Sequence, residues 1–226
     1  LIMVNYEVPQ EILLPYLPKH TELDLFEGKC YVSLVGFMFE NTKVMGIKIP
    51  FHINFEEVNL RFYVKHKHGD EWRRGVVFIK EIVSKSAITF VANKLYNENY
   101  ATHPMAHYIS SESGSTTIGY IWECKNAVNE IKFTTNNKKQ SLIKGSNEEF
   151  ITEHYWGYSK GKEATVEYAV EHPQWNIFDC LDYKVNCAFG EVYGNEFEFL
   201  EKQEPSSVFM AEGSEIVVRK GTRIKC

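Results

Sequence analysis

The sequence lacks the patterns that mark several large classes of protein. No apolar run approaches the ~18 residues of a membrane-spanning helix, and no basic, apolar leader opens the chain. There is no G-x-G-x-x-G, no phosphate-binding loop and no G-x-S-x-G elbow. We therefore expect no membrane partner, no cofactor and no serine-triad hydrolysis. Because the chain begins at Leu1 instead of Met, we expect a short segment to precede it.

Cysteine and positive charge are also scarce. The five cysteines are an odd number and contain no C-x-x-C pair, so free thiols in a reducing cytoplasm are expected. The 25 lysines and arginines are outnumbered by 30 acids, and the net charge is −5. Binding of nucleic acid needs clustered cations, so nucleic acid is not expected as a partner.

What the chain does contain is an abundance of strand-forming residues. Hydrophobic residues make up 44% and aromatic residues 14% of the 226 positions. Short alternating segments are separated by polar turns, which predicts an α+β fold, mainly antiparallel, with roughly ten strands and a few short helices. We expect one domain over residues 1–226, and the alternative is a boundary near Gly145-Ser146.

The expected elements follow the turn signals along the chain. Strands are expected at residues 1–7, 31–39, 73–83, 116–123, 130–135, 149–155, 163–170, 208–210 and 216–219. Helices are expected at 8–14, 86–96, 186–193 and 195–200, with Gly194 as a C-terminal cap. Residues 65–71 are expected to form a hairpin loop.

The stretch from residue 51 to 64 is the strongest candidate for chemistry. Its apolar residues are odd-numbered before Glu56 and even-numbered after Glu57, so a β-bulge at these two residues would restore a single apolar face. The opposite face then carries Glu57, Asn59 and Arg61 in a row, about 7 Å apart. One interpretation is the wet outer face of a half-exposed sheet. The other is a barrel interior, where Arg61 binds a carboxylate or enolate and Glu57 positions it or acts as a base.

Five blocks of the sequence resemble a known family. They are residues 1–8 (LIMVNYEV), 31–37 (YVSLVGF), 54–64 (NFEEVNLRFYV), 73–83 (RRGVVFIKEIV) and 207–214 (SVFMAEGS). Together they resemble the YqjF-like bacterial family of unknown function. That family is similar in fold to acetoacetate decarboxylase, which implies a cone-shaped β-barrel with an extra sheet and a site inside it.

The chemistry of the decarboxylase does not carry over with the fold. That enzyme forms a Schiff base through a lysine in a Pro-Lys-Lys run, and the corresponding residues 95–104 (LYNENYATHP) contain no lysine. Lys94 falls outside the expected apolar stripe of its helix. Lys80 is the amine nearest the expected site, and the resemblance favours an anion-binding role for it.

The segment that replaces the decarboxylase lysine supplies further candidates. By analogy of fold, Tyr96, Asn97, Tyr100 and His103 are expected to line the pocket. His103 and His107 have the spacing of metal ligands on a helix, but the intervening proline and the absence of a third ligand argue against a metal site.

The sequence leaves the function open between two classes. The first is a protein with an interior pocket for a small carbonyl or carboxylate compound, bound by the residues named above, with the catalytic residues and the reaction unknown. The alternative is a non-enzymatic carrier or sensor of a small apolar molecule. A buried acid with a shifted pKa beside Arg61 would favour the first, and a smooth apolar cavity the second. Whether the chain forms a homo-oligomer also stays open.

Overall fold

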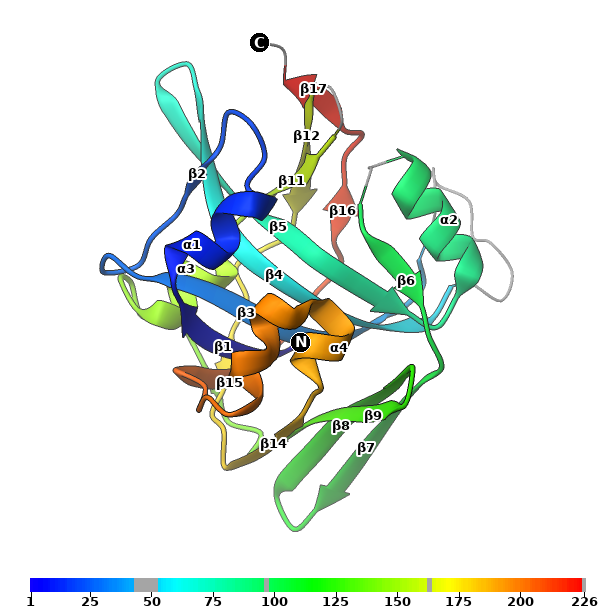
Figure 1. Ribbon diagram of the computed structural model, residues 1–226. Coiled ribbons are helices and arrows are strands. Elements are labelled where there is room, and N and C mark those ends of the chain that lie inside the picture. Colours follow the sequence, from blue (N-terminus) through cyan, green and yellow to red (C-terminus); the bar gives the residue numbers. More distant parts are fainter. Residues whose placement is uncertain (43–52, 96–97, 162–163, 225–226) are drawn as a thin grey trace.

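The computed structural model describes residues 1–42, 53–95, 98–161 and 164–224, and shows a strand-rich, mainly antiparallel α+β fold (Figure 1). The strands are β1 (Ile2–Val8), β2 (Glu22–Leu23), β3 (Cys30–Phe39), β4 (Phe55–His68), β5 (Glu71–Val83), β6 (Tyr100–Thr102), β7 (Met105–Glu112), β8 (Ser115–Cys124), β9 (Ala127–Thr135), β10 (Lys139–Gln140), β11 (Trp156–Lys160), β12 (Thr165–Glu171), β13 (Ile177–Phe178), β14 (Asp182–Asn186), β15 (Ser207–Ala211), β16 (Val217–Val218) and β17 (Thr222–Ile224). The helices are α1 (Gln10–Leu13), α2 (Ser86–Leu95), α3 (Asn147–Thr152) and α4 (Phe189–Tyr193), with 3₁₀ turns η1 (Leu14–Tyr16) and η2 (Asn195–Glu201).

Within the described residues, the strands form a 13-stranded sheet and a four-stranded sheet. The large sheet has the order β10-β13-β15-β1-β3-β4-β5-β11-β12-β16, and β2, β6 and β17 pair beside it. Most pairs are antiparallel, but β5 pairs with both β11 and β6 in parallel. The described ladder does not close its two ends on each other, so the sheet is not a closed barrel.

The central strand β4 is buried on both faces. Its even-numbered side chains, including Leu60 and Phe62, belong to a core shared with Trp122 and Phe133 of the small sheet. Its odd-numbered Tyr63 belongs to a second core, which α3 covers. In Figure 1 the small sheet lies below β4 and β5, and α2 lies beside β6.

A glycine lets the two sheets approach closely. A Cβ added to Gly36 on β3 would lie 2.4 Å from Cδ1 of Ile131 and 2.9 Å from the ring of Tyr120. Both distances are shorter than van der Waals contact, so a larger residue at this position would force the sheets apart.

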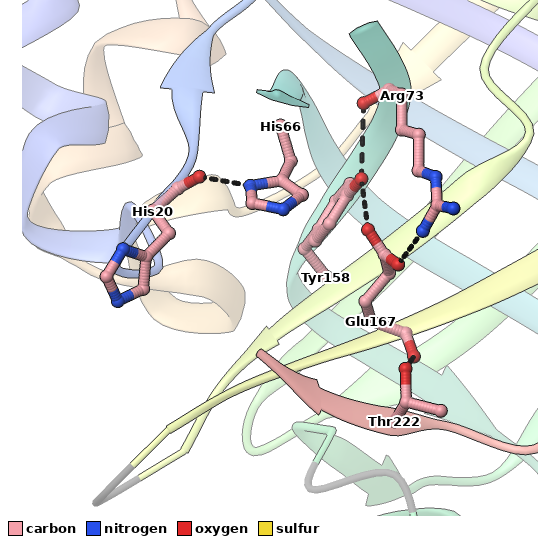
Figure 2. Close-up of polar contacts among 6 residues, drawn as sticks. All are labelled: His20, His66, Arg73, Tyr158, Glu167 and Thr222. Atoms are coloured by element: carbon pink, nitrogen blue, oxygen red, sulfur yellow. Dashed lines mark hydrogen bonds and ion pairs between the residues drawn. The ribbon is translucent and has the colours of Figure 1, made fainter. Parts of the chain in front are cut away.

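A polar cluster joins the far strands of the large sheet (Figure 2). Arg73 on β5 contacts the buried carboxylate of Glu167 on β12 at 2.5 Å. The Tyr158 hydroxyl on β11 lies 3.0 Å from the other Glu167 oxygen and 3.2 Å from the Arg73 carbonyl. Because a buried charge needs a partner, these contacts favour the observed placement of β11 and β12 beside β5.

Many expected elements are confirmed. Strands match the segments expected at 1–7, 31–39, 73–83, 116–123, 130–135 and 208–210, and the described part of the segment expected at 163–170, with shifts of up to three residues at their ends. The helix expected from residue 86 begins at Ser86, and Gly194 caps α4 with a φ of 129°. The strand β7 was not expected. No helix among the described residues has the length and apolarity to cross a membrane.

The expected bulge at Glu56-Glu57 is wrong. Both residues pair in unbroken register with β3, and β4 begins at Phe55. The change of parity in the sequence therefore marks the start of the strand. The register shift of this hairpin lies instead between Leu60 and Arg61, opposite β5.

The expected hairpin is confirmed with its turn at Gly69 and Asp70, but the loop is shorter than the expected 65–71, because the strands pair as far as His68 and Glu71. Trp72 on the return strand lies 5.0 Å from the Lys65 ammonium and 6.0 Å from the Lys67 ammonium, measured to the ring centroid. A further expectation is wrong. The strand expected at 149–155 is mostly helix α3, because Ser146 accepts a hydrogen bond from the Glu149 backbone as an N-cap.

Candidate functional site

Glu57, Asn59 and Arg61 lie on one face of β4, because alternate side chains of a strand point the same way. We call this side of the large sheet, which also carries Tyr63, the inner face. Glu57 is 2% and Asn59 1% exposed, and Arg61 is half-buried. These values exclude the wet outer surface that was one interpretation of the row.

Glu57 is held by hydrogen bonds at both carboxyl oxygens. Asn59 Nδ2 donates to Oε1 at 2.8 Å, and the Tyr100 hydroxyl donates to Oε2 at 3.1 Å. Burial raises the pKa of Glu57 to about 7, although these hydrogen bonds and the Arg61 charge act in the opposite direction. A carboxyl with this pKa exists in both protonation states at neutral pH, as general acid–base chemistry requires.

A second buried acid, Glu81 on β5, pairs directly opposite Asn59. It is 2% exposed, and burial, followed by the charges of Glu98 and Glu57, raises its pKa well above the usual value. Glu81 Oε2 and Asn59 Oδ1 are buried atoms with no hydrogen-bond partner in the described part of the chain. A carboxyl that is kept neutral is a hydrogen-bond donor as well as an acceptor.

A third acid, Glu98, lies just before β6 and is half-buried. The hydroxyl of Tyr168 on β12 donates to Glu98 Oε1 at 2.7 Å. Burial, with a smaller effect of the Glu57 charge, raises the pKa of Glu98 to about 8. The Tyr168 ring lies over Gly157 on β11, where an added Cβ would be 2.1 Å from ring atom Cζ. Gly157 therefore makes room for the ring that reaches Glu98.

The sequence pointed to neither Glu81 nor Glu98 as a site residue. A signal for Glu81 existed, because this acid lies two residues after the apolar run at 76–79, but its face depends on the register shift in the hairpin. Glu98 had no comparable signal. Its contact with Tyr168 joins residues 70 positions apart, and local periodicity does not reveal such a contact.

Arg61 lies between this group of acids and the Tyr63 side of the inner face. Its guanidinium carbon is 5.9 Å from the Tyr63 ring centroid. Its Nε is buried and has no hydrogen-bond partner among the described residues. Because an unmet buried donor is costly, this atom favours an acceptor such as a ligand carboxylate.

The remaining expected site residues are distributed differently. Tyr100 joins the acids, as described above. Lys80 points to the opposite side of β5, where its ammonium donates to the carbonyl of Val192 and burial lowers its pKa. His103 lies close enough to Lys80 for that charge to lower its pKa, after the larger effect of burial. Tyr96 and Asn97 lie outside the described residues.

Two surface grooves of the described structure can be compared with the position of the acids. A groove of about 170 Å³ reaches Glu98 and passes between Tyr16, Phe78 and Lys160, so it borders the group of acids. A larger groove of about 380 Å³ lies between Tyr6 and η2, away from these acids. We therefore locate the candidate site by its buried acids and Arg61, and not by the volume of a groove.

The described residues contain no group of three or more histidine, cysteine or acidic side chains arranged to hold a metal ion. Burial is the largest cause of the raised pKa of each of the three acids, and the charges of neighbouring acids add to it for Glu81 and Glu98.

The fold is that of the acetoacetate-decarboxylase-like proteins. The enduracididine biosynthesis enzyme MppR, solved in complex with pyruvate, superimposes with a TM-score of 0.65 at 11% identity, covering 98% of this chain and 86% of that one. An acetoacetate decarboxylase-like enzyme from Sphingomonas wittichii RW1 gives a TM-score of 0.60 at 12% identity, covering 99% and 90%.

The family is given by the sequence. The model of DUF2071, an uncharacterized conserved protein, matches residues 1–215, so the chain belongs to this family. The uncharacterized protein YqjF of Bacillus subtilis (strain 168) is 24% identical over 178 residues, which cover 77% of this chain and 70% of that protein. The resemblance seen in the sequence is confirmed.

Proposed function

We propose that the inner face binds a small oxo acid and catalyses proton transfer next to its carbonyl group. The observation that carries this proposal is Glu57, a buried acid with a pKa of about 7 within the field of Arg61. An acid titrating near neutral pH beside a cation matches the needs of enolisation. The cone-shaped arrangement of strands that the resemblance implies, with a site in its interior, and the cytoplasmic location expected from the free cysteines are parts of this proposal.

The proposed reaction assigns one role to each residue. Arg61 holds the carboxylate, and its charge also stabilises the enolate as it forms. The Glu57 carboxylate takes a proton from the carbon beside the carbonyl. The electron pair of the C–H bond forms the carbon–carbon double bond of the enolate, and the π pair of the carbonyl moves to its oxygen. Return of a proton from Glu57 to carbon restores the acid, so the reaction is balanced without a further reactant.

The neutral acids favour binding of an anion. Three charged carboxylates would repel a substrate carboxylate. Burial raises the pKa of Glu98 to about 8 and that of Glu81 well above its usual value, and both shifts favour the neutral acid. The site can then offer O–H donors instead of negative charges. MppR, a neighbour in fold, was solved with pyruvate, a small oxo acid of the class proposed here.

The proposed mechanism does not use a Schiff base. Lys94 is exposed, with its ammonium 5.5 Å from the Phe90 ring, and Lys80 lies on the other side of β5. The alternative of an apolar carrier has less support. An apolar ligand would leave the unpartnered atoms of Asn59, Arg61 and Glu81 unsatisfied.

Deuterium exchange tests the proposal. In D2O near pH 7, the protein should exchange the methyl protons of pyruvate for deuterium, seen as loss of the methyl signal in proton NMR. Glu57→Gln removes the base and Arg61→Gln removes the cation, so each should lower the exchange rate at least about 100-fold. Arg219→Gln is the matched control, because Arg219 pairs with Glu171 on the surface and should leave exchange unchanged.

Exchange at the buffer rate with the unaltered protein would refute the proposed reaction. Exchange that persists in Glu57→Gln would instead assign the proton transfer to another group.

A further inference from the structure

A histidine on the Tyr63 side of the inner face is held in one orientation, in which it can accept a hydrogen bond. His154 has a side chain 1% exposed, and its Nε2 lies 3.1 Å from Oδ2 of Asp24. The same oxygen accepts from Arg74 Nε at 2.6 Å. The Asp24 backbone N–H donates to the Tyr63 carbonyl at 3.0 Å, which ties this group to β4.

These contacts determine which nitrogen of His154 carries the hydrogen. The Arg74 cation and the His154 hydrogen bond hold the pKa of Asp24 below its usual value despite burial, so Asp24 is a carboxylate and can only accept. His154 must therefore donate from Nε2. Burial lowers the pKa of His154 to about 4, so the ring is neutral at pH 7 and Nδ1 keeps a free lone pair.

That lone pair is buried and unused. Nδ1 of His154 has no hydrogen-bond partner in the described residues. An acceptor left unmet in a protein interior is destabilising unless a bound molecule satisfies it. Asp24, itself bound by Arg74, fixes the orientation of the His154 ring. The ring therefore cannot rotate to bring Nδ1 to a partner.

The histidine and Arg61 both border the Tyr63 ring. The His154 and Tyr63 ring centroids are 4.7 Å apart, and the Arg61 guanidinium carbon is 5.9 Å from the same Tyr63 centroid. The Arg61 charge is one of the causes of the lowered pKa of His154. Within the described part of the chain, the inner face thus presents a buried donor without a partner, Arg61 Nε, and a buried acceptor without a partner, His154 Nδ1, around one aromatic ring.

We propose that His154 Nδ1 is a specificity-determining acceptor that selects carboxylates bearing a hydroxyl group. The carboxylate binds Arg61 and the hydroxyl donates to Nδ1, while Asp24 and Arg74 act as positioning residues for the ring. This inference rests on the proposed function, because it takes Arg61 as the carboxylate site, and it narrows the substrate class to oxo acids that also bear a hydroxyl group.

Matched pairs of ligands test the selection. Calorimetric titration compares lactate with propionate and hydroxypyruvate with pyruvate, so that each pair differs mainly by the hydroxyl. A hydroxyl that satisfies a buried acceptor should give the hydroxy acid about tenfold tighter binding. His154→Phe keeps a planar ring but removes Nδ1, and should abolish the preference while the plain acid still binds.

His66→Phe is the control, because the Nδ1 of this imidazole already contacts the His20 carbonyl at 2.6 Å (Figure 2). It should leave the preference intact. A second readout is independent of mutation: long-range proton–nitrogen NMR should show a bare Nδ1 on His154 that shifts with lactate and not with propionate.

The outcomes separate the two proposals. Equal affinity within both pairs, or a hydrogen found on Nδ1 of free His154, would overturn the role of His154 and leave the binding of oxo acids standing. If none of the four acids binds, the carboxylate site at Arg61 fails, and the selection by His154 fails with it.

Discussion

At the scale of single residues, the central feature is Glu57, an acid that is buried on one face of β4. Glu57 follows the same alternation as Asn59 and Arg61, so the sequence predicts their shared face. Whether that face is wet or buried depends on what covers it. In this fold β6 and β12 bring the hydroxyls of Tyr100 and Tyr168 to the acids, and burial is the largest cause of the raised pKa values of the acids.

The raised pKa of Glu57 predicts a dependence of stability on pH. Its pKa is about 7 in the folded chain against 4.5 when exposed, so the folded state binds more protons between these values. The stabilisation is complete below pH 4.5 and is lost as the pH rises through 7. Glu57→Gln cannot ionise, so its free energy of unfolding relative to the unaltered protein should rise by about 3 kcal/mol between pH 4 and 8.

Urea unfolding across that range measures this difference. A constant difference between the two proteins would show that Glu57 ionises as a solvated acid. Glu71→Gln, on the exposed end of β5, is the control and should show no such trend.

The lysines yield a second prediction at this scale. A Schiff base needs an unprotonated amine in contact with the substrate, and the ammonium of Lys80 is bound to Val192 away from the inner face. Borohydride added with acetoacetate or acetone should therefore leave the mass of the protein unchanged. A mass increase mapped to Lys80 or Lys94 would make that lysine a nucleophile and contradict the proposed mechanism.

At the scale of elements, α3 shows where local sequence signals compete. Residues 149–155 fit a strand by their apolar content, yet Ser146 and Glu149 form the pattern that begins a helix. The structure has the first contact of that pattern, since Ser146 Oγ accepts from the Glu149 N–H at 3.2 Å. The Glu149 side chain reaches back one residue further than the N-cap, and its Oε2 accepts from the Gly145 N–H at 2.6 Å. The capping signal was present in the sequence and outweighs strand propensity.

This cap can be tested directly. Ser146→Ala removes the acceptor for the Glu149 N–H and should lower the free energy of unfolding by about 1 kcal/mol in urea. Ser110→Ala, at an exposed position on β7, should change it by less than about 0.5 kcal/mol. Equal effects of the two substitutions would show that α3 does not depend on its cap.

At the scale of the whole molecule, the sequence predicts the strand-rich class and the hairpin of β4 and β5, because both are local. It predicts only part of the site, because Glu98 meets Tyr168 and His154 meets Asp24 through long-range contacts. Asp24 and His154 are 130 residues apart. Register shifts, such as the one opposite Arg61, also decide which face a residue joins, and periodicity does not reveal them.

A crystal structure of the protein grown with pyruvate tests the central claim most directly. The account predicts pyruvate on the inner face, with its carboxylate within hydrogen-bond distance of Arg61 Nε and its methyl carbon next to the Glu57 carboxyl. Pyruvate bound only in the groove between Tyr6 and η2, or an Arg61 whose Nε is bonded to a protein acceptor that excludes the ligand, would contradict it.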